Sequence, residues 1–234
     1  AVEIMHGSIF DQLREFNNRL AVIRSTRPDL TRIISDIEKK NQDGNYLFAI
    51  MVGDRLEHLL KRLLDEAEFL SDYGIRSLSK YYQDKPFVFG YLGNEYRIQY
   101  EPGESSSSMF GGNSNWRGPI WLPINYLIIN ALRKYYTYYG DSYTYEFPAN
   151  SGVKCTLKQI ANELTKRLLK IFERNENGQF QYHANNQSEW TDKHFKEPHL
   201  FYEFFHGDSG QGLGASHQTG WTALIANLLL EMDE

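Results

Sequence analysis

A glutamate flanked by aromatic residues is the first feature of this sequence that could do chemistry. Four aromatic residues surround Glu203, two on either side, and a glycine-rich stretch leads from there to Trp221. A carboxylate is costly to desolvate among aromatic rings unless it is hydrogen-bonded or held there for a purpose. The pattern therefore makes Glu203 a candidate catalytic carboxylate.

A second stretch, residues 109–121, carries side chains suited to binding a sugar. Its polar and aromatic members are Asn113, Asn115, Trp116, Arg117 and Trp121. The glycines among them free the backbone, so these side chains can converge on one concave spot. Tryptophan faces would stack on sugar rings, while the arginine and the asparagines would hydrogen-bond hydroxyl groups. The alternative is that Trp121 belongs to the core and Arg117 anchors an internal salt bridge.

The histidines near Glu203 do not form a metal motif. His206 and His217 lack the compact spacing of zinc ligands, and Cys155 is the single cysteine of the chain. We therefore expect no metal ion and no other cofactor. His217, together with Gln218 and Trp221, is instead a candidate for contacting the substrate.

The composition limits the class of protein. The chain has 234 residues and a net charge of −5, so no basic field favours nucleic acid as a partner. No apolar run approaches the length of a membrane span, and a single cysteine permits no internal disulfide, which favours a cytoplasmic location. The 15% aromatic content is typical of either a sugar-binding cleft or a well-filled core.

Helices must position these residues. Apolar periodicity predicts helices over residues 9–24, 30–40, 55–70, 123–139, 157–173 and 221–232. Between them lie two long irregular stretches, residues 71–123 and 178–220, which contain both candidate motifs and are glycine- and aromatic-rich. A small β-hairpin is expected around Gly93-Asn94. Helical pairs joined by long loops that gather at one mouth are typical of an all-α toroid.

Three motifs, taken together, resemble the C-terminal catalytic part of glycoside hydrolase family 63. They are residues 65–79, residues 111–121 and residues 203–221. Their order and spacing also fit, from about residue 44 to residue 232, and the sequence is most similar to a cytosolic, largely uncharacterised branch. The resemblance implies an (α/α)6 toroid, with residues 1–234 as the C-terminal part of a single catalytic domain. The N-terminal remainder of the enzyme would then be the partner of this chain.

The resemblance also implies a reaction, which is the hydrolysis of α-glycosidic bonds with inversion. The substrate would be an oligosaccharide or a small glycoside, and the activity would be α-glucosidase-like. Inversion needs two carboxyl groups roughly 6.5–9.5 Å apart. Glu203 matches the general base of the family, whereas the position of the general acid would fall before residue 1, so we expect this portion alone to be inactive.

Two alternatives stay open. Glu104, followed by Asp72 and Asp208, could supply an acid within the chain, although each also fits a solvated surface carboxylate. The chain could also be a non-catalytic glycan-binding or partner-binding helical domain that keeps the aromatic cleft and lacks the acid.

Overall fold

The computed structural model describes residues 2–31, 39–107, 115–176, 178–183 and 199–232. The chain divides into two compact units. Unit 1 comprises Ala1–Arg62 and Asn130–Ala161, and unit 2 comprises Leu63–Ile129 and Asn162–Glu234. Both candidate motifs therefore belong to unit 2.

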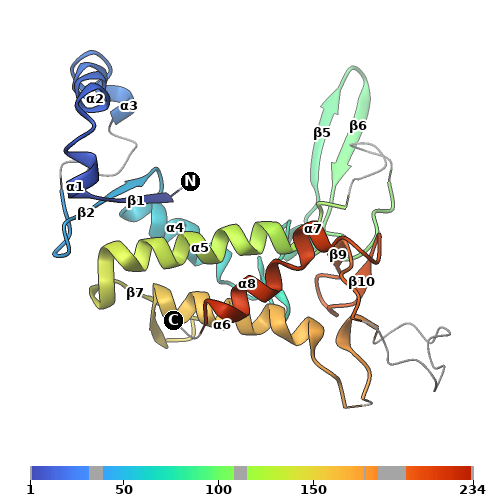
Figure 1. Ribbon diagram of the computed structural model, residues 1–234. Helices are drawn as coiled ribbons and strands as arrows, with labels where there is room; N and C mark the ends of the chain where they lie inside the picture. The colour runs from blue at the N-terminus through green and yellow to red at the C-terminus, as the bar shows by residue number, and fades with distance from the viewer. Residues whose placement is uncertain (1, 32–38, 108–114, 177, 184–198, 233–234) are drawn as a thin grey trace. The chain divides into compact units, whose positions relative to one another are not determined.

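Helices form most of the regular structure (Figure 1). They are α1 (Gly7–Phe10), α2 (Arg14–Thr26), α3 (Pro28–Thr31), α4 (Asp54–Leu63), α5 (Leu122–Tyr139), α6 (Leu157–Leu169), α7 (Thr219–Thr222) and α8 (Leu224–Leu230). The helix predicted over 123–139 is confirmed as α5. The helix predicted over 157–173 is α6 followed by a 3-10 turn at Lys170–Phe172, and the one predicted over 221–232 is divided into α7 and α8.

The N-terminal helical pair differs in detail from the prediction. The helix expected over 9–24 is split into α1 and α2, and α3 begins at Pro28, where proline is tolerated because the first turn needs no amide donor. Most of the helix predicted over 30–40 lies outside the described residues. None of the helices that the structure describes combines the length and the apolar character needed to traverse a bilayer.

The prediction that a helix continues to Leu70 is wrong. Helix α4 ends at Leu63, and the next residues form a turn around Asp65. The side chain of Asp65 accepts a hydrogen bond from the amide of Ala67 at 2.8 Å, and its carbonyl accepts from the amide of Leu70 at 3.0 Å. An aspartate that captures local amides in this way competes with helical hydrogen bonding and ends the helix.

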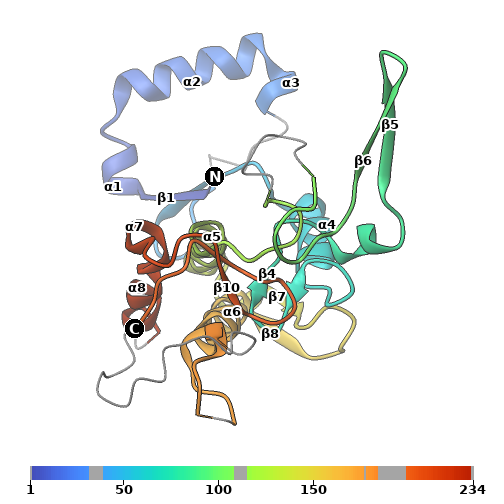
Figure 2. The same cartoon turned by 90° about the vertical axis from the view of Figure 1, so that its right-hand side faces the viewer.

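Short antiparallel strand pairs accompany the helices, so the described chain is a helical domain with strands rather than purely α. The pairs are β1 (Val2–His6) with β2 (Asn45–Ala49), β3 (Leu70–Ser71) with β4 (Gly74–Ile75), β5 (Phe87–Tyr91) with β6 (Asn94–Ile98), β7 (Thr144–Glu146) with β8 (Lys154–Thr156), and β9 (Phe204–Phe205) with β10 (Gly212–Leu213). The β5–β6 pair confirms the predicted hairpin, and both views show it standing out from the rest of unit 2 (Figures 1 and 2). The β1–β2 pair was not expected from the sequence.

The core of unit 2 is built around the segments that hold the motifs. Its fully buried side chains include Leu70, Ile120, Leu122, Leu164, Leu168, Tyr182, Phe204 and Phe205. Most of them belong to α5, α6 and β9. In the two helices the apolar side chains recur at helical spacing. The residues on either side of β9 are therefore held by a packed interior, which is what a precisely placed side chain requires.

Candidate active site

The three motifs meet at the backbone of Ile120. The amide of Ile120 donates to the carbonyl of Phe205 at 2.7 Å, and the amide of Phe205 donates back to Ile120 at 2.9 Å. On its other side, Ile120 forms a bridge with Arg76. The motifs at residues 65–79, 111–121 and 203–221 thus converge within unit 2.

A close approach of two chain segments at Gly118 supports this junction. Gly118 has a φ of 152°, and a Cβ there would lie 2.5 Å from the carbonyl oxygen of Glu101. Because such a contact is sterically impossible, glycine is required where the motif passes the segment that carries Glu101.

The tryptophans form one cluster centred on Trp121. Its ring stacks on Trp116 with the centroids 4.1 Å apart and on Phe204 at 4.9 Å, and it meets Trp221 edge to face at 5.6 Å. Trp121 is 4% exposed, whereas Trp116 is 45% exposed. The position of Trp121 favours the core interpretation, whereas Trp116 is stacked on Trp121 and exposed to solvent.

Trp221 brings a hydrogen-bond donor to the same cluster. Its indole Nε1 is buried, and among the described residues it has no hydrogen-bond partner. A buried donor without a partner carries a desolvation cost.

Arg117 and Asn115 hold the loop that carries Trp116. Arg117 is 4% exposed, lies 3.3 Å from a carboxylate oxygen of Glu101, and donates to the hydroxyl groups of Ser105 and Ser107. The side-chain oxygen of Asn115 accepts from the amide of Ser105 at 2.9 Å. These contacts favour the interpretation of Arg117 as an internal anchor. Asn113, the other predicted hydrogen-bonding residue, lies outside the described residues.

His217 and Gln218 lie at the start of α7. His217 is exposed and forms a backbone bridge with Phe201, and the amide of Gln218 donates to the carbonyl of Phe201 at 2.7 Å. The backbone of both residues therefore runs beside the segment that leads to Glu203.

Among the described residues, the hydrogen bonds of Glu203 are made with backbone groups. Its amide donates to the carbonyl of Ala215 at 2.8 Å, and its Oε2 accepts from the amide of Ala215 at 3.3 Å. A Cβ at Gly214 would lie 2.8 Å from the same oxygen, so glycine makes room for the carboxylate. Within the described part of the chain, no basic side chain forms an ion pair with Glu203. The carboxylate is thus oriented and partly exposed.

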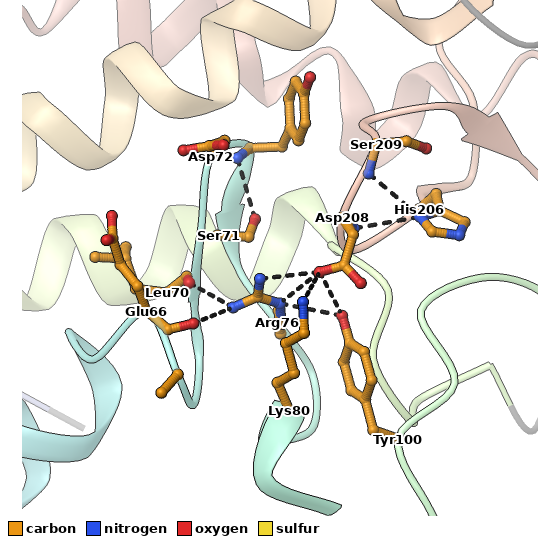
Figure 3. Close-up of polar contacts among 12 residues, drawn as sticks. Glu66, Leu70, Ser71, Asp72, Arg76, Lys80, Tyr100, His206, Asp208 and Ser209 are labelled. Atoms are coloured by element: carbon orange, nitrogen blue, oxygen red, sulfur yellow. Dashed lines mark hydrogen bonds and ion pairs between the residues drawn. The ribbon is translucent and has the colours of Figure 1, made fainter. Parts of the chain in front are cut away.

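Asp208 occupies a different environment from Glu203 (Figure 3). Its Oδ1 accepts from Arg76 Nη2 at 2.9 Å and from the hydroxyl of Tyr100 at 3.0 Å, and it lies 3.5 Å from Lys80 Nζ. The side chain of Arg76 is 6% exposed, and its Nη1 donates to backbone carbonyls that include that of Leu70. This network joins the turn after β9 to residues far away in the sequence.

These charges decide the protonation of Asp208. Burial alone would raise its pKa, but the hydrogen bond and the charge of Arg76, followed by Tyr100 and Lys80, outweigh burial and hold the pKa below its ordinary value. Burial raises the pKa of Tyr100, so its hydroxyl keeps its proton and stays a donor. A general acid must hold a proton near neutral pH, and Asp208 therefore does not fit that role.

His206 completes the turn. Its Nδ1 accepts from the amides of Asp208 at 3.2 Å and Ser209 at 3.3 Å, which requires the unprotonated form of that nitrogen. Burial lowers the pKa of His206, and the nearby charge of Asp208 opposes this only in part. The histidine is thus a neutral acceptor that closes the turn between β9 and β10.

The other two internal candidates for the acid are solvated. Glu104 is exposed, and the side chain of Asp72 is 76% exposed. Neither has the burial that raises a carboxyl pKa. In the described residues, no group of three or more His, Cys, Asp or Glu side chains is arranged to hold a metal ion.

Sequence reasoning did not find Arg76, Tyr100 or Thr222. Arg76 lies inside the first motif between Ile75 and Ser77, in a mixed polar and apolar stretch that gives no clear signal of a buried ion pair. Its partner Asp208 is not predictable from local pattern, because the two residues are 132 positions apart.

A helical domain in which a tryptophan cluster packs on Phe204, next to Glu203, is consistent with a carbohydrate-active class of protein, the glycoside hydrolases. The family model described as "Glycosyl hydrolase family 63 C-terminal domain" matches residues 47–231. The chain belongs to glycoside hydrolase family 63.

Several curated proteins are similar to the chain. The uncharacterized protein YMR196W of Saccharomyces cerevisiae is 45% identical over 97% of the chain, which covers 21% of that relative. Mannosyl-oligosaccharide glucosidase of the same yeast is 30% identical over 75% of the chain, or 15% of its own length. Alpha-glucosidase 2 of Arabidopsis thaliana is 23% identical over 80% of the chain, or 18% of its own length. The chain therefore spans about a fifth or less of these relatives.

Proposed function

We propose that the chain is the base-carrying part of an inverting, α-glucosidase-like hydrolase. Family membership supports glycosidase chemistry, and two relatives are named as glucosidases. Because the chain spans a small share of each relative, we place the rest of the (α/α)6 toroid and the general acid on the remainder of a longer polypeptide. Residues 1–234 would then belong to one catalytic domain with that remainder, and its cytoplasmic location stays a prediction.

The state of Glu203 carries this proposal. A general base must be ionised and must keep a lone pair open to the water that it activates. Glu203 is partly exposed, is oriented by Ala215, and has no cation paired to it among the described residues. Asp208 and Glu101 do not meet this requirement, because arginines pair with both.

In the proposed reaction, Glu203 takes a proton from water while the water oxygen attacks the anomeric carbon. The bond from that carbon to the leaving oxygen breaks, and the leaving oxygen takes a proton from the acid on the remainder. Attack and departure occur on opposite faces, so the configuration is inverted. The acid should therefore lie roughly 6.5–9.5 Å from Glu203.

The tryptophan cluster supplies the proposed contacts to the substrate. The exposed face of Trp116 is available for stacking, and Trp221, whose Nε1 is buried, remains a predicted contact to the substrate. Trp121, Arg117 and Asn115 would act by holding Trp116 in place. His217 and Gln218 remain predicted contacts to the substrate.

A non-catalytic glycan-binding or partner-binding domain is the second candidate. It would also use the exposed face of Trp116, so the cluster does not separate the two functions. The glucosidase names of the relatives favour the enzyme.

The test uses the natural full-length protein and a panel of α-linked disaccharides and glycosyl-glycerates. Proton NMR of the first-formed sugar should show the β-anomer, because inversion of an α-glycoside gives it directly. Glu203→Gln supplies the background rate. First formation of the α-anomer would contradict inversion, and binding of these sugars without hydrolysis would favour the glycan-binding domain.

The location of the acid has its own test. The 234-residue chain should leave disaccharides intact, because a poor leaving group needs protonation. An α-glycosyl fluoride needs little protonation and should be hydrolysed faster than the disaccharide. Brisk disaccharide hydrolysis by the chain alone would place an acid within these residues, and Glu104 would be the first to mutate.

A further inference from the structure

A buried hydroxyl touches the backbone beside Glu203. Thr222, the last residue of α7, is 0% exposed, and its Oγ1 donates to the carbonyl oxygen of Tyr202 at 2.6 Å. A buried hydroxyl is costly unless it has a partner, so this bond is a constraint on both segments. Tyr202 directly precedes Glu203 in the chain.

The planarity of the peptide bond transmits this constraint to Glu203. The carbonyl of Tyr202 and the amide of Glu203 belong to one rigid plane. Thr222 holds the oxygen of that plane, and the carbonyl of Ala215 accepts from its N–H at 2.8 Å. Hydrogen bonds therefore hold both the oxygen and the N–H of this peptide plane. The orientation of the plane in turn sets the direction of the Glu203 side chain.

The same helix carries the unpaired indole donor. Trp221 precedes Thr222 on α7 and contacts Trp121 edge to face. A second bond joins α7 to this segment, from the amide of Gln218 to the carbonyl of Phe201 at 2.7 Å. That bond is made by backbone, which no substitution of a side chain removes, whereas the bond from Thr222 is made by a side chain and can be tested.

We propose that Thr222 is a positioning residue that keeps the Glu203 carboxylate in register with Trp221. The proposal rests on the proposed role of Glu203 as the base. Thr222 does not reach the reacting atoms; it acts through the peptide plane between Tyr202 and Glu203. A misplacement of about 1 Å in such a group can cost up to about 100-fold in rate, so one hydrogen bond can matter here.

The test compares Thr222→Val with Thr222→Ser in the natural full-length protein. Valine keeps the shape and removes the donor, whereas serine keeps the donor and removes a methyl group. We expect Thr222→Val to lower kcat about 10-fold with KM changed less than about 3-fold, after correction for the folded fraction, and Thr222→Ser to restore kcat to within about 2-fold. A kcat in Thr222→Val within about 2-fold of the parent protein would overturn the proposal.

A second readout does not depend on activity. Amide hydrogen exchange, followed by mass spectrometry, should become about 10-fold faster at the Glu203 amide in Thr222→Val and return to the parent rate in Thr222→Ser. The Phe205 amide, which is bonded to Ile120, is the internal control and should not change. Unchanged exchange at Glu203 would show that Thr222 does not hold the plane.

The two proposals fail in different ways. Near-parent turnover in Glu203→Gln would remove the base assignment, while the exchange experiment would still decide whether Thr222 holds the peptide plane. Loss of turnover in Glu203→Gln with normal kcat in Thr222→Val would leave the base in place and remove Thr222 as its positioning residue.

Discussion

Glu203 and Asp208 are two carboxylates on either side of the same short strand, and their surroundings differ. Asp208 is bound by Arg76, Tyr100 and Lys80, so its charge stabilises the fold. Glu203 is oriented by the backbone of Ala215 and has no cation paired to it among the described residues. The Oδ1 of Asp208 is therefore occupied by structural side-chain partners, whereas Glu203 has no such partner in the described part of the chain.

The difference shows that two carboxylates of one motif can have very different partners. Sequence context is similar for the two, since both stand among aromatics and glycines. The two carboxylates differ in the groups that contact them in the folded protein. Pairing with a buried arginine locks a carboxylate in the ionised form and fills its acceptor sites.

The largest expected effect comes from Glu203→Gln. The amide keeps the size of the side chain but cannot accept a proton, so kcat should fall by at least about 100-fold in the full-length protein. Thermal unfolding should change little, because no ion pair is broken. A kcat close to that of the parent protein, or a loss of activity caused by unfolding, would contradict the proposed difference between Glu203 and Asp208.

Asp208→Asn should have the opposite effect to Glu203→Gln, with a large loss of stability and a smaller loss of activity. It leaves the nearly buried guanidinium of Arg76 without its counter-charge, and we expect unfolding free energy to fall by about 2–3 kcal/mol. Urea unfolding measures this change. Activity of the fraction that remains folded should exceed that of Glu203→Gln by at least about 10-fold. Equal losses of activity in the two variants would show that the carboxylates share one role.

Gly214→Ala tests whether the position of the Glu203 carboxylate matters for activity. The added methyl group would lie 2.8 Å from Oε2, at a φ of +70°, and should displace the carboxylate. We expect about 10-fold lower kcat and about 1 kcal/mol lower stability.

Gly93→Ala is the matched control for Gly214→Ala. Gly93 has a φ of +78° with nothing within 4 Å of the added Cβ, so it carries the same backbone strain without the contact. Lower kcat in Gly214→Ala alone would assign the effect to the contacts of the added Cβ, which would lie 2.8 Å from Glu203 Oε2 and 2.8 Å from the ring of Phe204. An equal kcat in both variants would remove these contacts as the cause.

The smallest effect concerns pH. Burial lowers the folded-state pKa of His206 below 6.5, so its contribution to stability is complete above pH 6.5 and is lost as pH falls through the folded value. His206→Asn keeps an acceptor near the Nδ1 position and does not titrate. The loss of stability between pH 7.5 and pH 5.5 should therefore be smaller in this variant by urea unfolding. An identical loss would exclude His206 as its source.

Asp208 adds a separate step at lower pH. Its folded-state pKa is held below 3.8, so its contribution is present above pH 3.8 and is lost as pH falls further. Asp208→Asn should remove this second step while leaving the first.

Local pattern predicted the elements that depend on local interactions. Helix α5 follows from apolar spacing, and the β5–β6 hairpin follows from the turn signal at Gly93-Asn94. The turn residues are in fact Leu92 and Gly93, both with positive φ, one position earlier than predicted. The end of α4 was missed because a single side chain, Asp65, competes with the helix. The β1–β2 ladder was missed because its partners are separated by several helices.

The sequence predicted which residues belong to the candidate site better than it predicted what each of them does. The motifs identified the tryptophans and Glu203, but no periodicity distinguishes the buried Trp121 from the exposed Trp116, which differ only in what stacks on each face. Arg117 was predicted to bind the substrate, with an internal salt bridge as the alternative, and its contact with Glu101, which sequence spacing does not encode, favours the salt bridge. Thr222 gave no signal, because a threonine on an apolar helix is ordinary.

The 132-residue separation between Arg76 and Asp208 has a consequence for biogenesis. Contacts of such long range form slowly, since a large loop must close before they contribute. During synthesis, Ile120 and Trp121 leave the ribosome well before Phe204 and Phe205 exist to cover them. The nascent chain therefore presents bare indole and aliphatic surface until the later segment arrives, which is the kind of surface that chaperones bind.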